Sequence, residues 1–257
     1  MTLRQFVNFF AMMAVFGAIS ACTATGPREG FAASDPYEPT NRAIHEFNVE
    51  LDRFVLRPVS QGYDIVTPTL VQHLVGNGLS HLDLTNDFAN YVLQGDIDRA
   101  LETLGRFTLN TIIGAAGLLD PATEFGLPKE DTDFGITLGK YGVEEGPYVV
   151  LPFLGPSTVR DTGGFVVDRA FSPTTYIGIF ADGELIADVA GPAVTGMAVI
   201  DGRASNAELI DNVLYNSPDS YVTIRSAYLQ RRRAKIAGDE GALDQLPDIF
   251  DEPALQR

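Results

Sequence analysis

Hydrophobic and polar positions alternate at helical spacing through most of the first half of the chain. A first helix is expected from about residue 40 to Arg57-Pro58, because proline disfavours a helical conformation in the residue before it. A second helix is expected from about residue 68 to Gln94-Gly95-Asp96, which should also cap the next one. Gly76 and Gly78 weaken this segment, so two helices are an alternative to one.

Residues 97–113 carry the clearest amphipathic pattern. The apolar positions on one side are Ile97, Leu101, Leu104, Thr108 and Ile112, and the polar positions on the other are Arg99, Glu102, Arg106 and Asn110. We expect an amphipathic helix over this segment.

The second half of the chain is more interrupted. A helix is expected over residues 156–170, and residues 173–200 are apolar but broken by glycine and by Gly191-Pro192. Two helices follow, at about 201–215 and 217–237, divided at Ser217-Pro218. With no internal repeat and no strand alternation longer than a few residues, the predicted fold is mostly α.

One stretch between these halves, Asp133–Gly164, is rich in glycine and proline, largely apolar and poor in charge. Gly139, Gly142 and Gly146 recur every three to four residues, which allows backbone to approach backbone or a ligand closely. The stretch is interpreted as a buried irregular core segment or as chain along a membrane-facing surface.

The N-terminus resembles an export signal with a lipid-attachment site. Arg4 precedes an apolar run from Phe9 to Ile19 that is too short to span a bilayer and typical of a signal peptide. It ends in Ile19-Ser20-Ala21-Cys22, which resembles a bacterial lipobox, and Cys22 is the only cysteine. Lipidation of Cys22 is therefore predicted; an ordinary signal peptide or a buried thiol are the alternatives. Thr23 follows the cysteine where Asp would indicate retention in the inner membrane.

Charge and composition narrow the function. A formal net charge of -16 argues against a nucleic-acid partner, since phosphate binding needs a basic face. The basic run Arg231-Arg232-Arg233 with Lys235 is interpreted as a cationic helix C-terminus. After the signal peptide, no apolar run reaches the roughly 20 residues of a membrane span, although helices lying in the plane of a leaflet remain compatible with the pattern.

Catalytic and ligand-binding motifs are missing or incomplete. Asp133-Phe134-Gly135 stands without the other kinase motifs, and residues 135–141 are one residue short of a phosphate-binding loop. The three histidines lack metal-ligand spacing, and the acidic clusters lack the pattern of a calcium loop. We therefore expect no enzyme activity, no cofactor, no metal and no nucleotide.

Short motifs follow one another in order from Asp35 to about Arg232. They are Asp35-Pro36-Tyr37-Glu38-Pro39-Thr40-Asn41-Arg42, Arg57-Pro58-Val59, Asn77-Gly78-Leu79-Ser80, Leu93-Gln94-Gly95-Asp96, Arg106-Phe107, Asn110-Thr111, Asp133-Phe134-Gly135, Thr137-Leu138-Gly139, Tyr141-Gly142-Val143, Gly146-Pro147-Tyr148, Leu151-Pro152, Gly155-Pro156-Ser157 and Arg160-Asp161. Each is weak alone, but in this order and behind a lipobox the set resembles the MlaA (VacJ) family of outer-membrane lipoproteins. The chain departs from the family in lacking Trp and in a shorter interval between Leu79 and Leu93.

The resemblance implies a single compact, ring-like helical domain that encloses an amphipathic pore in the outer membrane. Phospholipids misplaced in the outer leaflet would enter this pore and leave to a soluble periplasmic carrier, and a trimeric outer-membrane porin would hold the ring. Membrane phospholipids are thus the implied substrates. The alternative is a non-catalytic envelope scaffold that anchors a partner without conducting lipid.

The expected organisation has four parts: a signal peptide (1–21), a lipidated flexible tether (22–34), the helical domain (35–237) and an acidic tail (238–257). The protein would be anchored in the outer membrane through Cys22 and face the periplasm. The candidate residues of the lipid path are Arg106, Lys140, Arg160, Gly139, Gly142, Gly146 and Tyr148. The three cations could contact headgroups, or instead form ion pairs that pin the helices together.

Overall fold

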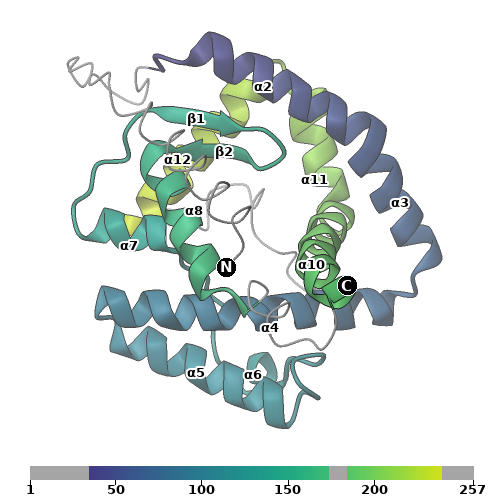
Figure 1. Cartoon of the computed structure of the whole chain (residues 1–257), viewed down its shortest axis with the longest axis vertical. Helices are drawn as coiled ribbons and strands as arrows, with labels where there is room; N and C mark the ends of the chain where they lie inside the picture. Colours follow the sequence, from purple (N-terminus) through teal and green to yellow (C-terminus); the bar gives the residue numbers. More distant parts are fainter. Residues whose placement is uncertain (1–34, 174–183, 239–257) are drawn as a thin grey trace. The chain divides into compact units, whose positions relative to one another are not determined.

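The computed structural model describes residues 35–173 and 184–238, and helices make up most of it (Figure 1). The elements are α2 (Glu38–Leu51), the π-helix η1 (Asp52–Leu56), α3 (Arg57–Val66), α4 (Thr69–Gln94), α5 (Ile97–Ile112), α6 (Pro121–Glu124), α7 (Phe134–Lys140), β1 (Tyr148–Leu151), β2 (Gly155–Thr158), α8 (Val159–Phe171), α10 (Glu184–Ser205), α11 (Ala207–Asp211), the π-helix η2 (Asn212–Asn216) and α12 (Ser220–Ala237). The prediction of a mostly α fold is confirmed.

The expected stop at Arg57-Pro58 is wrong, because helical backbone continues from α2 through η1 into α3. Arg57 N–H donates to the carbonyl of Asp52, five residues back, as in a π-turn. Pro58 then lies in the first turn of α3, where its missing N–H is tolerated. The helix ends instead at Thr67, which is extended before Pro68.

The second predicted helix is the single helix α4, which Gly76 and Gly78 do not divide. A Cβ at Gly76 would lie 3.3 Å from the Asp201 side chain of α10, so this glycine lies where the two helices pack closely. At the other end Gly95 takes a left-handed conformation (φ 72°), and the Asp96 side chain accepts the Arg99 N–H of α5. The predicted cap and helix start are confirmed.

A short antiparallel hairpin, β1–β2, was not expected in the glycine-rich stretch. The open edge of β1 is paired by side chains of α2. Asn41 donates to the Tyr148 carbonyl (3.0 Å) and accepts the Val150 N–H (2.9 Å). Asn48, two turns later, bonds the Leu151 carbonyl and the Phe153 N–H in the same way. The helix thus supplies the partners that a further strand would give.

The C-terminal part also differs from the expected boundaries. Helix α10 begins by Glu184, includes Pro192 and ends at Ser205, so the predicted break at Gly191-Pro192 and the predicted start of a new helix at about residue 201 are wrong. Residues 207–216 form α11 and the π-helix η2 instead. The break at Ser217-Pro218 is confirmed, and Asp219 caps α12 by accepting the Val222 N–H.

Packing contacts connect the elements in a closed order (Figure 1). Helix α2 packs on β1, β1 pairs with β2, β2 contacts α8, α8 packs on α7, α7 on α4, α4 on α10, α10 on α3, and α3 joins α2 through η1. Helix α5 lies alongside α4, and α12 contacts α7, β2 and η2. The apolar core around Tyr148, Val150, Tyr221 and Leu229 lies where the hairpin meets α12.

Candidate functional site

The amphipathic helix α5 has its apolar side outward. Its buried residues are Ala100, Thr103, Arg106 and Asn110, whereas the side chains of Ile97, Leu101, Leu104 and Ile112 are 58%, 60%, 43% and 76% exposed. In a water-soluble protein the apolar side of such a helix packs against the core. The reversed arrangement presents a hydrocarbon surface to the surroundings of the protein.

Large apolar side chains are exposed on other elements too. They include Phe54 of η1, Ile65 and Val66 of α3, Leu70 of α4, Phe125 after α6, and Phe153 and Leu154 at the turn of the hairpin. Many buried side chains, in contrast, are polar, including Asn41, Asp52, Asn90 and Arg203. The exposed apolar row along α5 is a patch of the kind that marks a site of protein or membrane interaction. Among the described residues, no helix is both long enough and apolar enough to cross a bilayer.

A cavity of about 260 Å³ lies between α4, α8 and α10. Its apolar lining residues are Leu79, Leu82, Phe165, Val194 and Ala198, and its polar ones are Asp83, Asn86, Asp168, Arg169, Ser172 and Thr195. Roughly 150 Å³ is enough to admit a molecule such as benzene. The cavity therefore has room for part of an amphipathic ligand, with contacts for both of its ends.

The polar side of this cavity is held in place by a buried network. Asn90 Nδ2 donates to Asp168 Oδ1 (3.0 Å), and the Phe134 N–H donates to both oxygens of the same carboxylate (3.0 and 3.1 Å). Burial raises the pKa of Asp168 in spite of these hydrogen bonds. The guanidinium of the neighbouring Arg169 lies 5.0 Å from the centre of the Phe165 ring.

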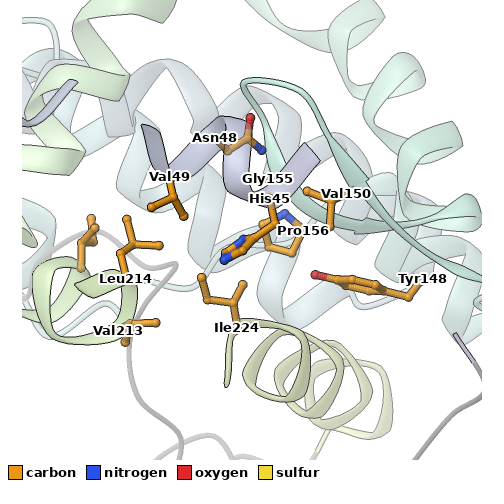
Figure 2. A pocket seen from close by; sticks show the side chains of 11 residues that line it. His45, Asn48, Val49, Tyr148, Val150, Gly155, Pro156, Val213, Leu214 and Ile224 are labelled. Carbon is orange, nitrogen blue, oxygen red and sulfur yellow. The ribbon is translucent and has the colours of Figure 1, made fainter. Parts of the chain in front are cut away.

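A smaller cavity, of about 190 Å³, lies between α2, the hairpin, η2 and α12 (Figure 2). It is lined mostly by apolar groups, among them Val49, Val213, Leu214 and Ile224. The two polar side chains contributed by α2 are engaged: His45 Nε2 lies 2.8 Å from Ser220 Oγ, and Asn48 bonds the hairpin. Burial lowers the pKa of His45, so the imidazole is neutral at pH 7. With its polar side chains engaged, this cavity offers less to an amphipathic ligand than the one beside α4.

Arg106 is buried on the inner side of α5. It donates to Asp120 Oδ2 (2.7 Å), to the Leu127 carbonyl (2.7 Å) and to Thr123 Oγ1. Burial opposes the ionised form of Asp120, but hydrogen bonds from Thr123 and Asn110 and the charge of Arg106 outweigh it and lower the pKa. These contacts join α5 to α6, which is the ion-pair arrangement considered as the alternative for this residue.

Arg160 is also buried in an ion-pair network. Its Nε donates to Asp161 Oδ1 (2.9 Å), and Asp161 additionally accepts from Tyr228 (2.8 Å) and Arg232 (3.1 Å) of α12. Burial opposes the ionised form of Asp161, but Arg232 and Arg160 outweigh it and lower the pKa. Arg232 also pairs with Asp133. The basic end of α12 therefore fixes α7 and α8.

The remaining candidates lie in the glycine-rich stretch. Lys140, at the end of α7, is exposed and donates to Gln94 Oε1 (2.8 Å). A Cβ at Gly139 would lie 2.5 Å from Ile236 Cδ1 of α12, while Gly142 and Gly146 have positive φ (85° and 68°). Tyr148 is in the apolar core and lines the smaller cavity.

None of these seven residues is among the described residues that line the cavity between α4, α8 and α10, although Lys140 lines a more open hollow with Gln94, Gly95 and Asp96. Cys22 lies outside the described part of the chain. The lining comes from three helices far apart in sequence, so no single motif marks it. One local signal exists: Asp83 and Asn86 are polar positions three residues apart, which places them on the same face of α4.

Comparison with known proteins identifies the family. The family model for the MlaA lipoprotein matches residues 33–235. The chain belongs to the MlaA lipoprotein family. A relative named intermembrane phospholipid transport system lipoprotein MlaA, from Escherichia coli K12, is 34% identical and covers 82% of this chain and 81% of its own length. The Haemophilus influenzae protein of the same name is 31% identical over 84% and 85%. An uncharacterized protein of Rickettsia felis is 37% identical over 79% and 78%.

A solved structure shares the fold of this MlaA family member. The study that describes it is called "Structural basis for maintenance of bacterial outer membrane lipid asymmetry". The match has a TM-score of 0.69 at 34% identity and covers 79% of this chain and all of the solved one. The resemblance noted in the sequence motifs is thereby confirmed.

Proposed function

We propose that this chain is an outer-membrane lipoprotein that removes mislocalised phospholipids from the outer leaflet and passes them to a soluble periplasmic carrier. It would thereby maintain the lipid asymmetry of the outer membrane. The names of the E. coli and H. influenzae relatives and the subject of the solved structure support this proposal. The observation in this chain that carries it is the outward apolar side of α5 together with the amphipathic cavity beside α4.

The outward apolar surface fits a protein embedded in lipid. Each side chain of the size of Leu gains roughly 1.5–3 kcal/mol when it is fully removed from water. Exposing Ile97, Leu101, Leu104 and Ile112 to water would forgo much of that free energy, whereas a leaflet would recover it. We therefore place α5 in the hydrocarbon of the membrane, lying along the leaflet.

The closed order of packing contacts supports the pore. Elements that follow one another from α2 through the hairpin, α8, α7, α4, α10 and α3 back to α2 can enclose a passage. A phospholipid that crosses a bilayer alone must carry its polar headgroup through hydrocarbon, at high cost. The cavity between α4, α8 and α10, with polar and apolar walls, would lower that cost. We assign the lipid path to this cavity.

The anchor and partners complete the proposal. Cys22 would carry acyl chains that hold the protein in the outer membrane, with residues 1–21 removed, 22–34 as the tether and 238–257 as a tail. A trimeric porin would bind the apolar outer surface. Lys140, the exposed cation among the earlier candidates, remains a candidate headgroup contact at the rim, together with the glycines Gly139, Gly142 and Gly146 and with Tyr148. Arg106 and Arg160 are assigned to the ion pairs described above, which hold the wall together.

The test is complementation of a strain from which the gene has been deleted. Deletion is expected to raise surface-exposed phospholipid, measured with a membrane-impermeant amine reagent, and to raise sensitivity to detergent. The natural chain should reverse both changes. Ala198→Phe, which fills the cavity from α10, should not reverse them although the protein folds and reaches the membrane.

Val199→Phe is the matched control, since Val199 is the next residue of α10, is 43% exposed and is not among the cavity-lining residues. It should complement like the natural chain. Unchanged asymmetry after deletion would exclude the transport function. Full complementation by Ala198→Phe would favour the scaffold, which needs an anchor and a docking face but no passage.

A further inference from the structure

The cavity between α2, the hairpin, η2 and α12 differs in its chemistry from the cavity beside α4 (Figure 2). Aspartate, glutamate, lysine and arginine are absent from the described residues that line it, whereas the lining beside α4 includes Asp83, Asp168 and Arg169. A phosphate or an ammonium group would find no counter-charge in this lining, and burying it there would be costly. The cavity is therefore suited to hydrocarbon and not to a lipid headgroup.

The polar side chains of this lining are already used within the protein. The His45 imidazole is paired with the Ser220 hydroxyl (2.8 Å), and both polar atoms of the Asn48 amide bond the backbone of the hairpin. The Tyr148 ring packs edge to face with Tyr221, with ring centres 6.0 Å apart. A buried water molecule needs about two to four polar partners. With its polar side chains engaged in this way, the cavity favours hydrocarbon over water as well.

Apolar side chains from several elements enclose the remaining space. Figure 2 shows Val49, Leu214 and Ile224 pointing toward a common space from α2, η2 and α12. Val150, Val213 and Ile224 are buried, whereas Val49 and Leu214 are half-buried. The buried side chains close the cavity, and the half-buried ones lie where it opens to the surroundings of the protein.

The π-helix η2 supplies two of these side chains, Val213 and Leu214. Short π-helical segments are rare, and they occur frequently at functional sites. Here η2 follows α11 directly, so the helix departs from α geometry at the position where it lines the cavity. This irregularity is independent of the cavity volume, and it favours a binding site over a defect in packing.

The volume fits part of a hydrocarbon chain. A cavity of roughly 150 Å³ binds benzene, so one of about 190 Å³ has room for roughly six to eight carbon atoms. The end of an acyl chain can fill this space while the rest of the lipid stays outside. The exposed apolar side of α5 places the protein among phospholipids, whose chains would be the most abundant hydrocarbon at the opening.

We propose that this cavity is an acyl-chain site, which binds the methyl end of one chain of a phospholipid. Val213 and Ile224 would surround the chain end, and Val49 and Leu214 would contact the chain where it enters. The inference rests on the proposed function and adds a second place at which the protein holds its lipid, by the hydrocarbon and not by the headgroup.

The test is photolabelling of the full-length, lipidated protein in phospholipid vesicles, because a detergent chain would compete for the cavity. The vesicles contain a small fraction of phosphatidylethanolamine with a diazirine near the methyl end of one chain. Irradiation attaches this probe to the residues that it contacts, and mass spectrometry of the digested protein locates them. A second probe carries the diazirine near the ester carbonyl and reports on the other end of the chain.

The methyl-end probe should label Ile224, and the carbonyl-end probe should not. Val213→Phe fills the cavity and should remove the label from Ile224. Val213→Thr keeps the shape of the side chain but brings a hydroxyl group into the lining, so it should reduce this label about fivefold. Val222→Phe is the matched control, since Val222 lies on α12, is 44% exposed and is not among the described lining residues. It should leave the label on Ile224 unchanged, and the label on Leu101 of α5 should be equal in all of these proteins.

Two results would overturn the site: label that is confined to exposed apolar residues such as those of α5, or label on Ile224 that persists in Val213→Phe and Val213→Thr. Circular dichroism melts establish that each variant is folded, and Val213→Thr keeps the test open if Val213→Phe does not fold. Cys22→Ser removes the proposed acyl anchor. Label on Ile224 that appears only in this variant would show that the natural protein holds its own anchor chain there, and would refute the phospholipid assignment.

The proposed function and the acyl-chain site fail in different ways. If the natural chain does not restore asymmetry in the deletion strain, the transport function is refuted whatever the labelling shows. If it restores asymmetry and Ile224 is not labelled, only the acyl-chain site is refuted.

Discussion

The outward apolar side of α5 leads to a prediction that separates membrane binding from folding. The perturbation is the double variant Leu101→Ser, Ile112→Ser, made in a chain that also carries Cys22→Ser so that no acyl anchor contributes. Both residues are largely exposed, so neither contributes much to the packing of α5 on α4. Removing them should therefore affect the interaction of the protein with its surroundings and not its fold.

The magnitude follows from the exposed fractions. At 60% and 76% exposure, each side chain leaves roughly 1–2 kcal/mol of apolar transfer free energy to be gained from a membrane. The double variant should thus lose about 2–4 kcal/mol of partition free energy, which corresponds to about a 30- to 1000-fold weaker partition into lipid. Its free energy of unfolding should change by less than about 0.5 kcal/mol per site, as for other surface substitutions.

Flotation with phospholipid vesicles measures the partition, and chemical denaturation measures the stability. The conservative double variant Leu101→Val, Ile112→Val keeps the surface apolar and should float nearly like the parent chain. Equal flotation of the serine variant and the parent would show that α5 does not enter lipid. A loss of more than about 2 kcal/mol of stability would show instead that this side of α5 is packed in the folded protein.

Three further predictions concern buried polar groups. Arg203 donates to Asp52 (2.7 and 3.1 Å) in a buried ion pair. Arg203→Met leaves the buried carboxylate without its partner and should lower the free energy of unfolding, measured in urea, by about 3–5 kcal/mol. A loss below about 1 kcal/mol would contradict this prediction. Asn41→Leu leaves one carbonyl and one N–H of β1 unpaired, so the free energy of unfolding should fall by about 2–6 kcal/mol and the Tm should fall with it. Asn41→Gln carries the same amide on a longer side chain and is not expected to restore the stability at this tight site. Burial raises the pKa of Asp87 well above its usual range, so this group costs stability at pH 7, either as a buried charge or because it takes up a proton on folding. Asp87→Asn keeps the acceptor for the Thr132 N–H and should raise the Tm at pH 7; the gain should shrink as pH falls and the natural carboxyl takes up its proton, and a constant gain would refute it.

The sequence periodicity identified helices better than it identified their surroundings. The pattern at residues 97–112 predicts an amphipathic helix, and α5 is one. Periodicity cannot tell which side packs, because it records only that polar and apolar positions are segregated. In α5 the side with Arg106 and Asn110 is the buried one, held by Asp120 from beyond the helix, a contact that no local pattern encodes.

Two errors have different causes, one local and one in contacts distant along the chain. Pro58 was expected to end a helix, but η1 shifts the hydrogen bonding by one residue just before it. The four-residue strands of the hairpin are too short for a pattern, and the edge of β1 is completed by Asn41, more than 100 residues earlier. The larger cavity is likewise assembled from three separate helices, so motif matching pointed to other residues.

The glycine-rich stretch Asp133–Gly164 contributes to the proposed passage through helix packing. A Cβ at Gly164 would lie 2.4 Å from the Gly135 nitrogen, so the absence of side chains there lets α7 and α8 approach backbone to backbone. That approach brings the Phe134 N–H within hydrogen-bond distance of the Asp168 carboxylate. Asp168 and the next residue, Arg169, both line the cavity. The glycines would therefore act on the proposed lipid path indirectly, by fixing the helix α8 that carries Asp168 and Arg169. The proposed passage would depend on rigid helix contacts, and the buried ion pair Arg160–Asp161 is one of the contacts that hold α8 in place.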